Sequence, residues 1–231
     1  MVDLAHGIRG IRAGSVVLAQ SVVHGPAGSV HLAVVDPGVG TDRRGVAIVS
    51  GRGDLLVGPD NGLLPRAADA LDGAAAVFEL TDPRYRLEPV SSTFHGRDVF
   101  APAAAYLALG VLAPELGGEI DPGELVGAPE LVTRVSDGAL SSDVARVDWY
   151  GNLQLAATEA DLVRAGLIDD VVVEGPAGSF AAVVGRTFTD AGPDGLVVYV
   201  DSGGHVAVAC NGASARERLH DPERLTVKKK S

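Results

Sequence analysis

The feature that most constrains this chain is an apolar run at residues 30–35 that ends in Asp36 and a glycine-rich turn. The run is nearly continuous in Val, Leu and Ala, which is typical of a parallel strand covered on both faces. Open α/β sheets place their ligand crevice at the carboxyl ends of such strands. Asp36 therefore occupies a position where this fold class keeps functional groups, and Arg43 follows in the same loop.

A second polar stretch, residues 92–98, opens a predicted helix that extends to residue 109. It contains His95, and a histidine near the positive end of a helix tends to stay neutral, which suits a hydrogen bond to water. Asp36, Arg43 and His95 are therefore candidates for holding and polarising one water molecule. A plain Asp-Pro turn and a structural histidine explain the same residues, and the pattern alone leaves both readings open.

The order of the predicted elements indicates two domains. Strands alternate with helices over residues 1–120, which predicts an α/β domain with a mostly parallel sheet and flanking helices. Residues 110–130 are rich in Pro, Gly and acids and read as a linker. Short β-like runs with Gly, Asp and Pro turns over residues 131–231 predict a smaller, barrel-like all-β domain. The expected helices are 11–23, 63–71, 94–109 and 159–165, and the expected strands are 30–35, 45–50, 55–57, 75–80, 144–149, 153–156, 170–173, 180–184, 196–200 and 206–209.

Composition narrows the function. A net charge of -11 argues against binding a phosphate backbone, so we expect no nucleic-acid partner. No apolar run approaches the roughly 20 residues that cross a bilayer, and no leader is expected. The single cysteine, Cys210, fits a reducing compartment, and a cytoplasmic protein is predicted. The six histidines show no metal-ligand spacing, so no metal is expected. The basic run at residues 228–230 reads as a solvated tail.

A loop in the second half, residues 148–152, joins two predicted strands through Asp, Trp, Tyr, Gly and Asn. One reading is a hairpin turn with a packed aromatic side chain. The other is a binding loop, in which an aromatic face stacks on a base, Asn152 reads its edge and Asp148 accepts an ammonium group.

Together these stretches resemble the S-adenosyl-L-methionine (SAM) hydrolase family, adenosine-forming, also called SAM hydroxide adenosyltransferases. SAM-dependent fluorinases and chlorinases belong to the same superfamily. The resemblance is carried, in chain order, by residues 36–43, 59–64, 93–98, 148–152, Phe188 and 202–203. It implies an N-terminal α/β domain, a β-rich C-terminal domain and a homotrimer, in which the substrate lies between the α/β domain of one subunit and the β domain of its neighbour.

The resemblance also implies a reaction and a set of residues. Water attacks C5′ of the ribose in line with the sulfonium and yields adenosine and L-methionine, with no cofactor. Asp36, Arg43 and His95 would activate the water. Substrate binding would involve Asn61, Thr93 and Phe94 near the ribose, Tyr150, Asn152 and Phe188 at adenine, and Asp148 and Ser202 at the methionine end.

Two alternatives accompany this expectation. Halogenase relatives carry tyrosines at the positions of Asp36 and His95, a halide-contacting serine at Gly96, and a long loop where residues 51–54 are short, so hydrolysis is favoured. Family members also have a strand and helix before the position of Met1, with an acid that grips the ribose hydroxyls. Without that segment, a catalytically silent adenosine- or SAM-binding protein is the second expectation.

Overall fold

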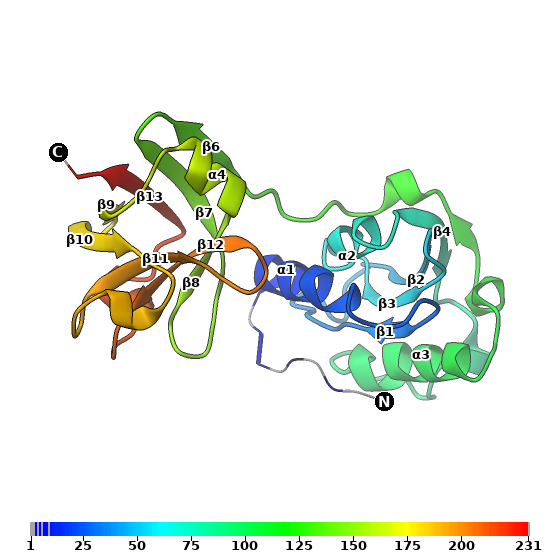
Figure 1. Ribbon diagram of the computed structural model, residues 1–231. Helices are drawn as coiled ribbons and strands as arrows, with labels where there is room; N and C mark the ends of the chain where they lie inside the picture. Colours follow the sequence, from blue (N-terminus) through cyan, green and yellow to red (C-terminus); the bar gives the residue numbers. More distant parts are fainter. Residues whose placement is uncertain (1–2, 4, 6, 9, 231) are drawn as a thin grey trace. The chain divides into compact units, whose positions relative to one another are not determined.

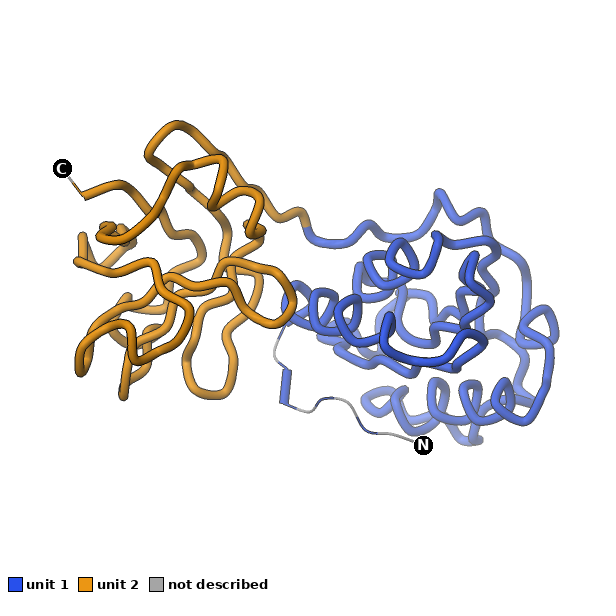
Figure 2. The backbone as a smooth tube through the Cα atoms, viewed as in Figure 1, with its two compact units in different colours: residues 1–129 blue, residues 130–231 orange. Residues whose placement is uncertain are grey.

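The computed structural model describes residues 3, 5, 7–8 and 10–230 and divides the chain into two compact units (Figure 2). The first unit is residues 1–129 and the second is residues 130–231. The segment read as a linker carries two 3-10 turns and a short strand that pairs within the first unit.

The sheet of the first unit has five strands in the order β1-β3-β2-β4-β5 (Figure 1). Their bounds are β1 Val30–Leu32, β2 Gly45–Ser50, β3 Leu55–Pro59, β4 Ala74–Glu79 and β5 Glu119–Ile120. Only the β1–β3 pairing is parallel within this described sheet, so the sheet is mixed and the predicted mostly parallel sheet is not found. The reason is local: residues 51–54 are too few for a crossover, and they join β2 and β3 as an antiparallel hairpin.

Helices cover both faces of this sheet, because alternate strand residues point to opposite sides. Val46 and Ile48 of β2 are fully buried against α1 (Ile11–Val22) and α2 (Pro65–Asp69). Ala47 between them packs in a second cluster with Phe100 and with α3 (Ala101–Ala108). The result is an α/β/α arrangement in three layers (Figure 1).

Two elements near the predicted site differ from expectation. The strand before Asp36 is three residues long and lies at the sheet edge, so Leu32 is 46% exposed and coverage of both faces was a wrong prediction. The predicted helix from residue 94 begins as a π-helical turn, Gly96–Phe100, that continues into α3. His95 occupies the N-cap position of this turn, and no side-chain hydrogen bond caps it.

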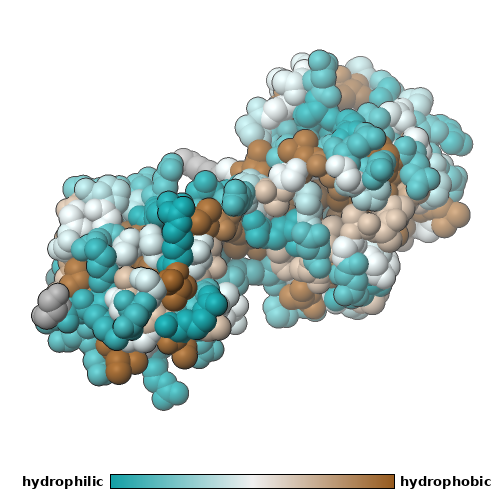
Figure 3. Space-filling model, turned by 90° about the horizontal axis from the view of Figure 1, so that it is seen from above, coloured by the Kyte–Doolittle hydropathy of each residue, from teal (hydrophilic) through white to brown (hydrophobic). Residues whose placement is uncertain are grey.

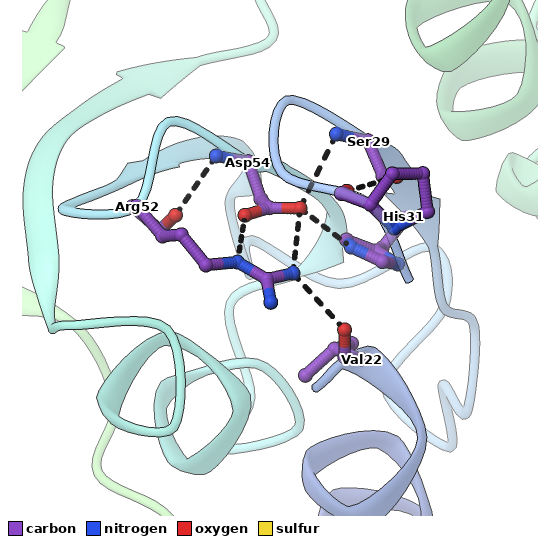
Figure 4. Close-up of polar contacts among 7 residues, drawn as sticks. Val22, Ser29, His31, Arg52 and Asp54 are labelled. Carbon is purple, nitrogen blue, oxygen red and sulfur yellow. Dashed lines mark hydrogen bonds and ion pairs between the residues drawn. The ribbon is translucent and has the colours of Figure 1, made fainter. Parts of the chain in front are cut away.

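A charged cluster lies beneath the β2–β3 hairpin (Figure 4). The fully buried carboxylate of Asp54 accepts hydrogen bonds from Arg52 Nε at 2.7 Å, from Arg52 Nη2 at 3.1 Å and from the Ser29 amide at 3.2 Å. His31 Nε2 of β1 lies 3.2 Å from the same carboxylate. Arg52 Nη2 also donates to the Val22 carbonyl at the end of α1. The cluster therefore fastens one hairpin to the start of β1 and the end of α1.

The second unit is a closed barrel of seven strands, which confirms the barrel-like prediction. The strands follow the order β7-β8-β12-β11-β10-β9-β13, β13 pairs back to β7, and β6 adds to β7 outside the ring. Their bounds are β6 Thr133–Ser136, β7 Ala139–Val147, β8 Leu153–Thr158, β9 Asp170–Gly175, β10 Gly178–Val184, β11 Leu196–Val200, β12 His205–Cys210 and β13 Arg224–Lys229. Two short helices, α4 Glu159–Arg164 and α5 Ala215–Arg218, complete the unit.

The closing strand was missed by the sequence prediction, which read its lysines as a solvated tail. Leu225 and Val227 of β13 are fully buried and alternate with outward polar residues. Lys228 forms an ion pair with Glu174 of β9, with Nζ and Oε2 2.6 Å apart. Lys228 therefore lies on the outer face of a barrel strand, and Lys229 is the last residue of that strand.

Figure 3 shows hydrophilic residues over much of the visible face, with hydrophobic residues in separate small patches. In the part of the chain that the structure describes, no helix is long and apolar enough to cross a membrane.

Candidate active site

Asp36 and Arg43 face each other across one turn of the loop that follows β1. Arg43 donates from Nε to both carboxylate oxygens of Asp36, at 3.0 and 3.1 Å, and from Nη2 to Oδ2 at 2.5 Å. The side chain of Arg43 is 11% exposed and that of Asp36 is 5% exposed. A charge-assisted contact of this kind is stronger than one between neutral groups and fixes the plane of the carboxylate.

The same guanidinium also binds His95, which is brought from a loop far along the sequence. Arg43 Nη2 lies 2.8 Å from His95 Nδ1. Because a guanidinium has donors and no acceptor, Nδ1 must accept this hydrogen bond, and the ring proton of the neutral imidazole then lies on Nε2. Arg43 therefore sets both the carboxylate plane and the histidine tautomer.

The two loops meet because Gly40 permits a close approach. Its φ is +79°, which is the left-handed region that favours glycine. A Cβ built on Gly40 would lie 2.4 Å from the Ser92 carbonyl oxygen, so a side chain at this position would push the loops apart. The glycine-rich turn is thus needed to place His95 beside Arg43.

Two buried side chains, those of Phe100 and Asp98, help to hold the trio in position. The Arg43 guanidinium stands over the ring of the fully buried Phe100, 5.0 Å from its centroid. Asp98, 1% exposed, accepts from Arg97 at 2.6 and 2.9 Å and from the Ser91 amide at 2.8 Å. The Arg97 hydrogen bond, followed by the Ser91 amide, lowers the pKa of the Asp98 carboxyl. Asp98 therefore closes the loop that carries His95, a role that sequence reasoning missed although the residue lies in the quoted motif.

The other predicted residues of the first unit adjoin members of this trio, Asn61 through a hydrogen bond to the residue before Asp36, and Thr93 and Phe94 in the sequence. Asn61 donates from Nδ2 to the Val35 carbonyl at 3.0 Å, directly before Asp36, and accepts from the Leu63 amide at 3.2 Å. Thr93 and Phe94 precede His95 and are exposed, Phe94 by 54%. Their side chains are accessible, and Asn61 fixes the backbone that delivers the acid.

A cavity of about 490 Å³ opens in the second unit, within the range of small-molecule pockets. It brings together four predicted residues, Asp148, Asn152, Phe188 and Ser202. The remaining lining residues are Arg146, Gln154, Arg186, Thr187, Tyr199, Val200, Asp201 and Ala207. Tyr150, predicted at adenine, is 78% exposed and does not line this cavity.

The loop that carries Asp148 is a tight turn built on its own carboxylate. Oδ1 accepts from the amides of Tyr150 and Asn152, both at 2.9 Å, and Oδ2 accepts from Asn152 Nδ2 at 2.8 Å. Trp149 at the tip is 95% exposed, so the reading with a packed aromatic side chain is wrong. The turn instead presents Asp148 and Asn152 to the cavity.

One wall of the cavity is aromatic. Phe188 and Tyr199 meet edge to face, with ring centroids 5.4 Å apart. Burial raises the pKa of the Tyr199 hydroxyl, and the charges of Asp148 and Asp201 raise it further. Tyr199 was not predicted, because inside a Val-rich strand it reads as a core residue.

Within the described residues, no group of three or more His, Cys, Asp and Glu side chains could hold a metal ion.

Two models of known protein families match this chain, one in each half. The family model described as SAM hydroxide adenosyltransferase N-terminal domain matches residues 1–117. The one described as SAM hydroxide adenosyltransferase C-terminal domain matches residues 142–227.

The chain is also similar to individual proteins over most of its length. The chain is 48% identical over 221 residues to (R)-S-adenosyl-L-methionine hydrolase of Salinispora arenicola (strain CNS-205), covering 95% of this chain and 82% of the relative. It is 40% identical over 243 residues to the protein of that name from Thermus thermophilus, covering 99% and 87%. A crystal structure of an uncharacterized conserved protein from Thermotoga maritima aligns with a TM-score of 0.87 at 28% identity, covering 99% of this chain and 88% of that one.

Proposed function

The chain belongs to the SAM hydroxide adenosyltransferase family, and we infer from this premise that it hydrolyses S-adenosyl-L-methionine to adenosine and L-methionine. The observation that carries the mechanism is the joint contact of Arg43 with Asp36 and His95. These three residues are the proposed catalytic residues.

The geometry of the trio suggests how one water is held. The water accepts a hydrogen bond from His95 Nε2–H with one lone pair and donates a proton toward the Asp36 carboxylate. Its second lone pair is then free to attack C5′. The C5′–O bond forms as the C5′–S bond breaks, and the proton of the water passes to Asp36 and then to solvent. Arg43 keeps both partners of the water in place.

The leaving group needs no acid. The sulfur of the substrate carries a positive charge and departs as the neutral thioether of methionine, so charge is dispersed in the transition state. A preorganised pocket that excludes bulk water favours such a step. We assign the ribose contacts to Asn61, Thr93 and Phe94, adenine to Tyr150, Asn152 and Phe188, and the methionine end to Asp148 and Ser202.

The substrate stereochemistry and the location in the cell complete this proposal. The curated relatives are named for the (R) sulfonium epimer, and we propose the same epimer for this chain. Its single cysteine is compatible with a reducing compartment, so we propose a cytoplasmic enzyme.

We further propose a homotrimer in which the α/β unit of one subunit and the β unit of its neighbour share each substrate, as the family resemblance implies. Mixed trimers test this proposal. Asp36→Asn and Asn152→Ala subunits, each inactive alone, should regain part of the turnover when they are refolded together. No regain from a sample that forms mixed trimers would contradict shared sites.

Product analysis tests the reaction itself. Incubation with SAM should release adenosine and methionine in equal amounts, measured by chromatography. Asp36→Ala and His95→Ala should bind SAM without turnover. Full turnover in both variants would exclude the proposed mechanism, and binding by the natural chain without any product would favour a silent binding protein.

A further inference from the structure

The cavity of the second unit contains more charge than the proposed substrate contacts use. Two acids, Asp148 and Asp201, and two arginines, Arg146 and Arg186, line it. Paired charges of both signs suit a ligand that carries both signs itself, such as an α-amino acid. The proposed contacts give a role to Asp148 and leave the arginines without one.

Arg146 is held in position by a chain of hydrogen bonds across the barrel wall. It lies on β7 directly opposite Gln154 of β8, and its Nε donates to Gln154 Oε1 at 3.0 Å. Gln154, 5% exposed, donates in turn to Asp201 Oδ2. Asp201 Oδ1 accepts from the amides of Gly203 and His205 at 2.8 and 3.0 Å. A buried amide thus orients the arginine and ties it to the loop that carries the predicted Ser202.

This arrangement leaves the terminal nitrogens of Arg146 for a ligand. The contact to Gln154 uses Nε, and among the described residues no salt bridge joins Arg146 to a carboxylate. Nη1 and Nη2 are the pair of donors that an arginine presents to a planar carboxylate. Arg146 is also two residues from Asp148, which follows the end of β7, and both residues line the cavity.

We propose that Arg146 binds the α-carboxylate of the substrate's amino-acid end, with Gln154 and Asp201 as its positioning residues. The inference rests on the proposed function, because it adds a contact to the same substrate. In an α-amino acid the ammonium and carboxylate groups share one carbon, so their protein partners must be neighbours of opposite charge. Asp148 and Arg146 meet that requirement, and the contact makes Arg146 a determinant of specificity.

A pair of substrates that differ only in the carboxylate tests the proposal. Calorimetry gives the Kd of the full chain and of Arg146→Gln for SAM and for its decarboxylated analogue. Loss of a hydrogen-bonded charge pair should weaken SAM binding by about 10- to 100-fold. Binding of the analogue should change by less than about 2-fold, since it has no group for the arginine to bind.

Matched variants separate this role from a structural one. Arg164→Gln removes the same charge from an exposed ion pair on α4, and its Kd for SAM should equal that of the natural chain. Arg146→Lys keeps the charge without the forked donors and should lose part of the affinity for SAM alone. Gln154→Leu should weaken SAM binding and spare the analogue.

An equal loss for both ligands in Arg146→Gln, or no loss for either, would overturn the inference. The binding measurement also distinguishes failure of this inference from failure of the proposed function. If the natural chain binds SAM and releases no product, hydrolysis is refuted, while the carboxylate comparison still decides the role of Arg146.

Discussion

Two clusters of the same three residue types, Asp, Arg and His, lie in the first unit and differ in which group stands at the centre. In the candidate site, the guanidinium of Arg43 is central and binds Asp36 on one side and His95 on the other. Beneath the β2–β3 hairpin, the carboxylate of Asp54 is central and receives the arginine and the histidine together (Figure 4).

The difference determines what remains available for chemistry. Asp54 is fully buried, and three separate groups donate to its carboxylate. A central carboxylate therefore consumes its own hydrogen-bonding capacity in holding the fold together. A central arginine does the opposite, because it fixes an acid and an imidazole and leaves His95 Nε2 and the Asp36 lone pairs able to act on a third group. Identical composition thus gives a cluster that holds the fold together in one place and the proposed catalytic trio in the other.

The largest contrast should come from removing each acid. Asp36→Asn removes the proposed proton acceptor and should lower kcat by about 10²- to 10⁴-fold with little change in the Kd for SAM. Asp54→Asn should leave kcat near that of the natural chain at temperatures where the variant is folded. Steady-state kinetics on both variants measures the contrast. Equal losses of kcat would mean that the two clusters do not differ in function.

Replacing each arginine by lysine sharpens the comparison. Lysine is a point charge and cannot hold both the Asp36 carboxylate and the His95 ring in one plane. Arg43→Lys should therefore lower kcat by roughly 10²-fold, which is the cost of small misplacements in a catalytic set. Arg52→Lys is the matched control and should keep its kcat. A natural rate in Arg43→Lys would show that the central guanidinium is dispensable.

Stability should show the reverse order. Asp54→Asn leaves the Arg52 charge without its partner, and because that side chain is a quarter exposed we expect a loss of about 2 kcal/mol, below the ~3–5 for fully buried pairs. Hydrogen exchange read by mass spectrometry should show faster exchange in β1–β3. Peptides from the barrel provide the internal control. Unchanged exchange in β1–β3 would contradict the structural role of this cluster.

The smallest effect concerns pH. The Arg52 hydrogen bond, with a further contribution from His31, lowers the pKa of the Asp54 carboxyl in the folded protein. Its stabilising contribution is complete above the unfolded pKa of about 3.9 and is lost as pH falls from there through the lower folded value. Protection of the first unit against hydrogen exchange, corrected for the intrinsic pH dependence of amide exchange, should therefore fall below about pH 4. Asp54→Asn should show a shallower acid dependence, and an unchanged dependence would assign it to other carboxylates.

Sequence reasoning predicted the trio because its motifs are local and ordered along the chain. Asp36 and Arg43 share a turn, and His95 opens the next conspicuous motif. It could not predict the Asp54 cluster, because residues 51–54 read only as a short loop and the partner histidine belongs to an apolar run. Such clusters depend on pairing between distant elements, which one sequence does not specify.

The fold, like the candidate site, was predictable from the sequence only in part. Alternating short strands predicted the barrel, yet β6 and β13 were missed, because β6 is four residues long and β13 ends in lysines. The parallel character of the first sheet was overestimated, although the four residues between β2 and β3 already required a hairpin. Arg146 was also not predicted, since its proposed role depends on the buried amide of Gln154 on the neighbouring strand.

The way the barrel closes has a consequence for folding of the chain during its synthesis on the ribosome. Arg224 of β13 bonds to Asp143 of β7, a partner translated 81 residues earlier. Until β13 emerges, β7 and β9 each present an unpaired edge, which is a hazard for association between nascent chains. The strands of the first unit are all translated by Ile120, so that unit can fold before the closing strand of the barrel has been synthesised. The order of translation makes the barrel, with its cavity, the last part of the protein to mature.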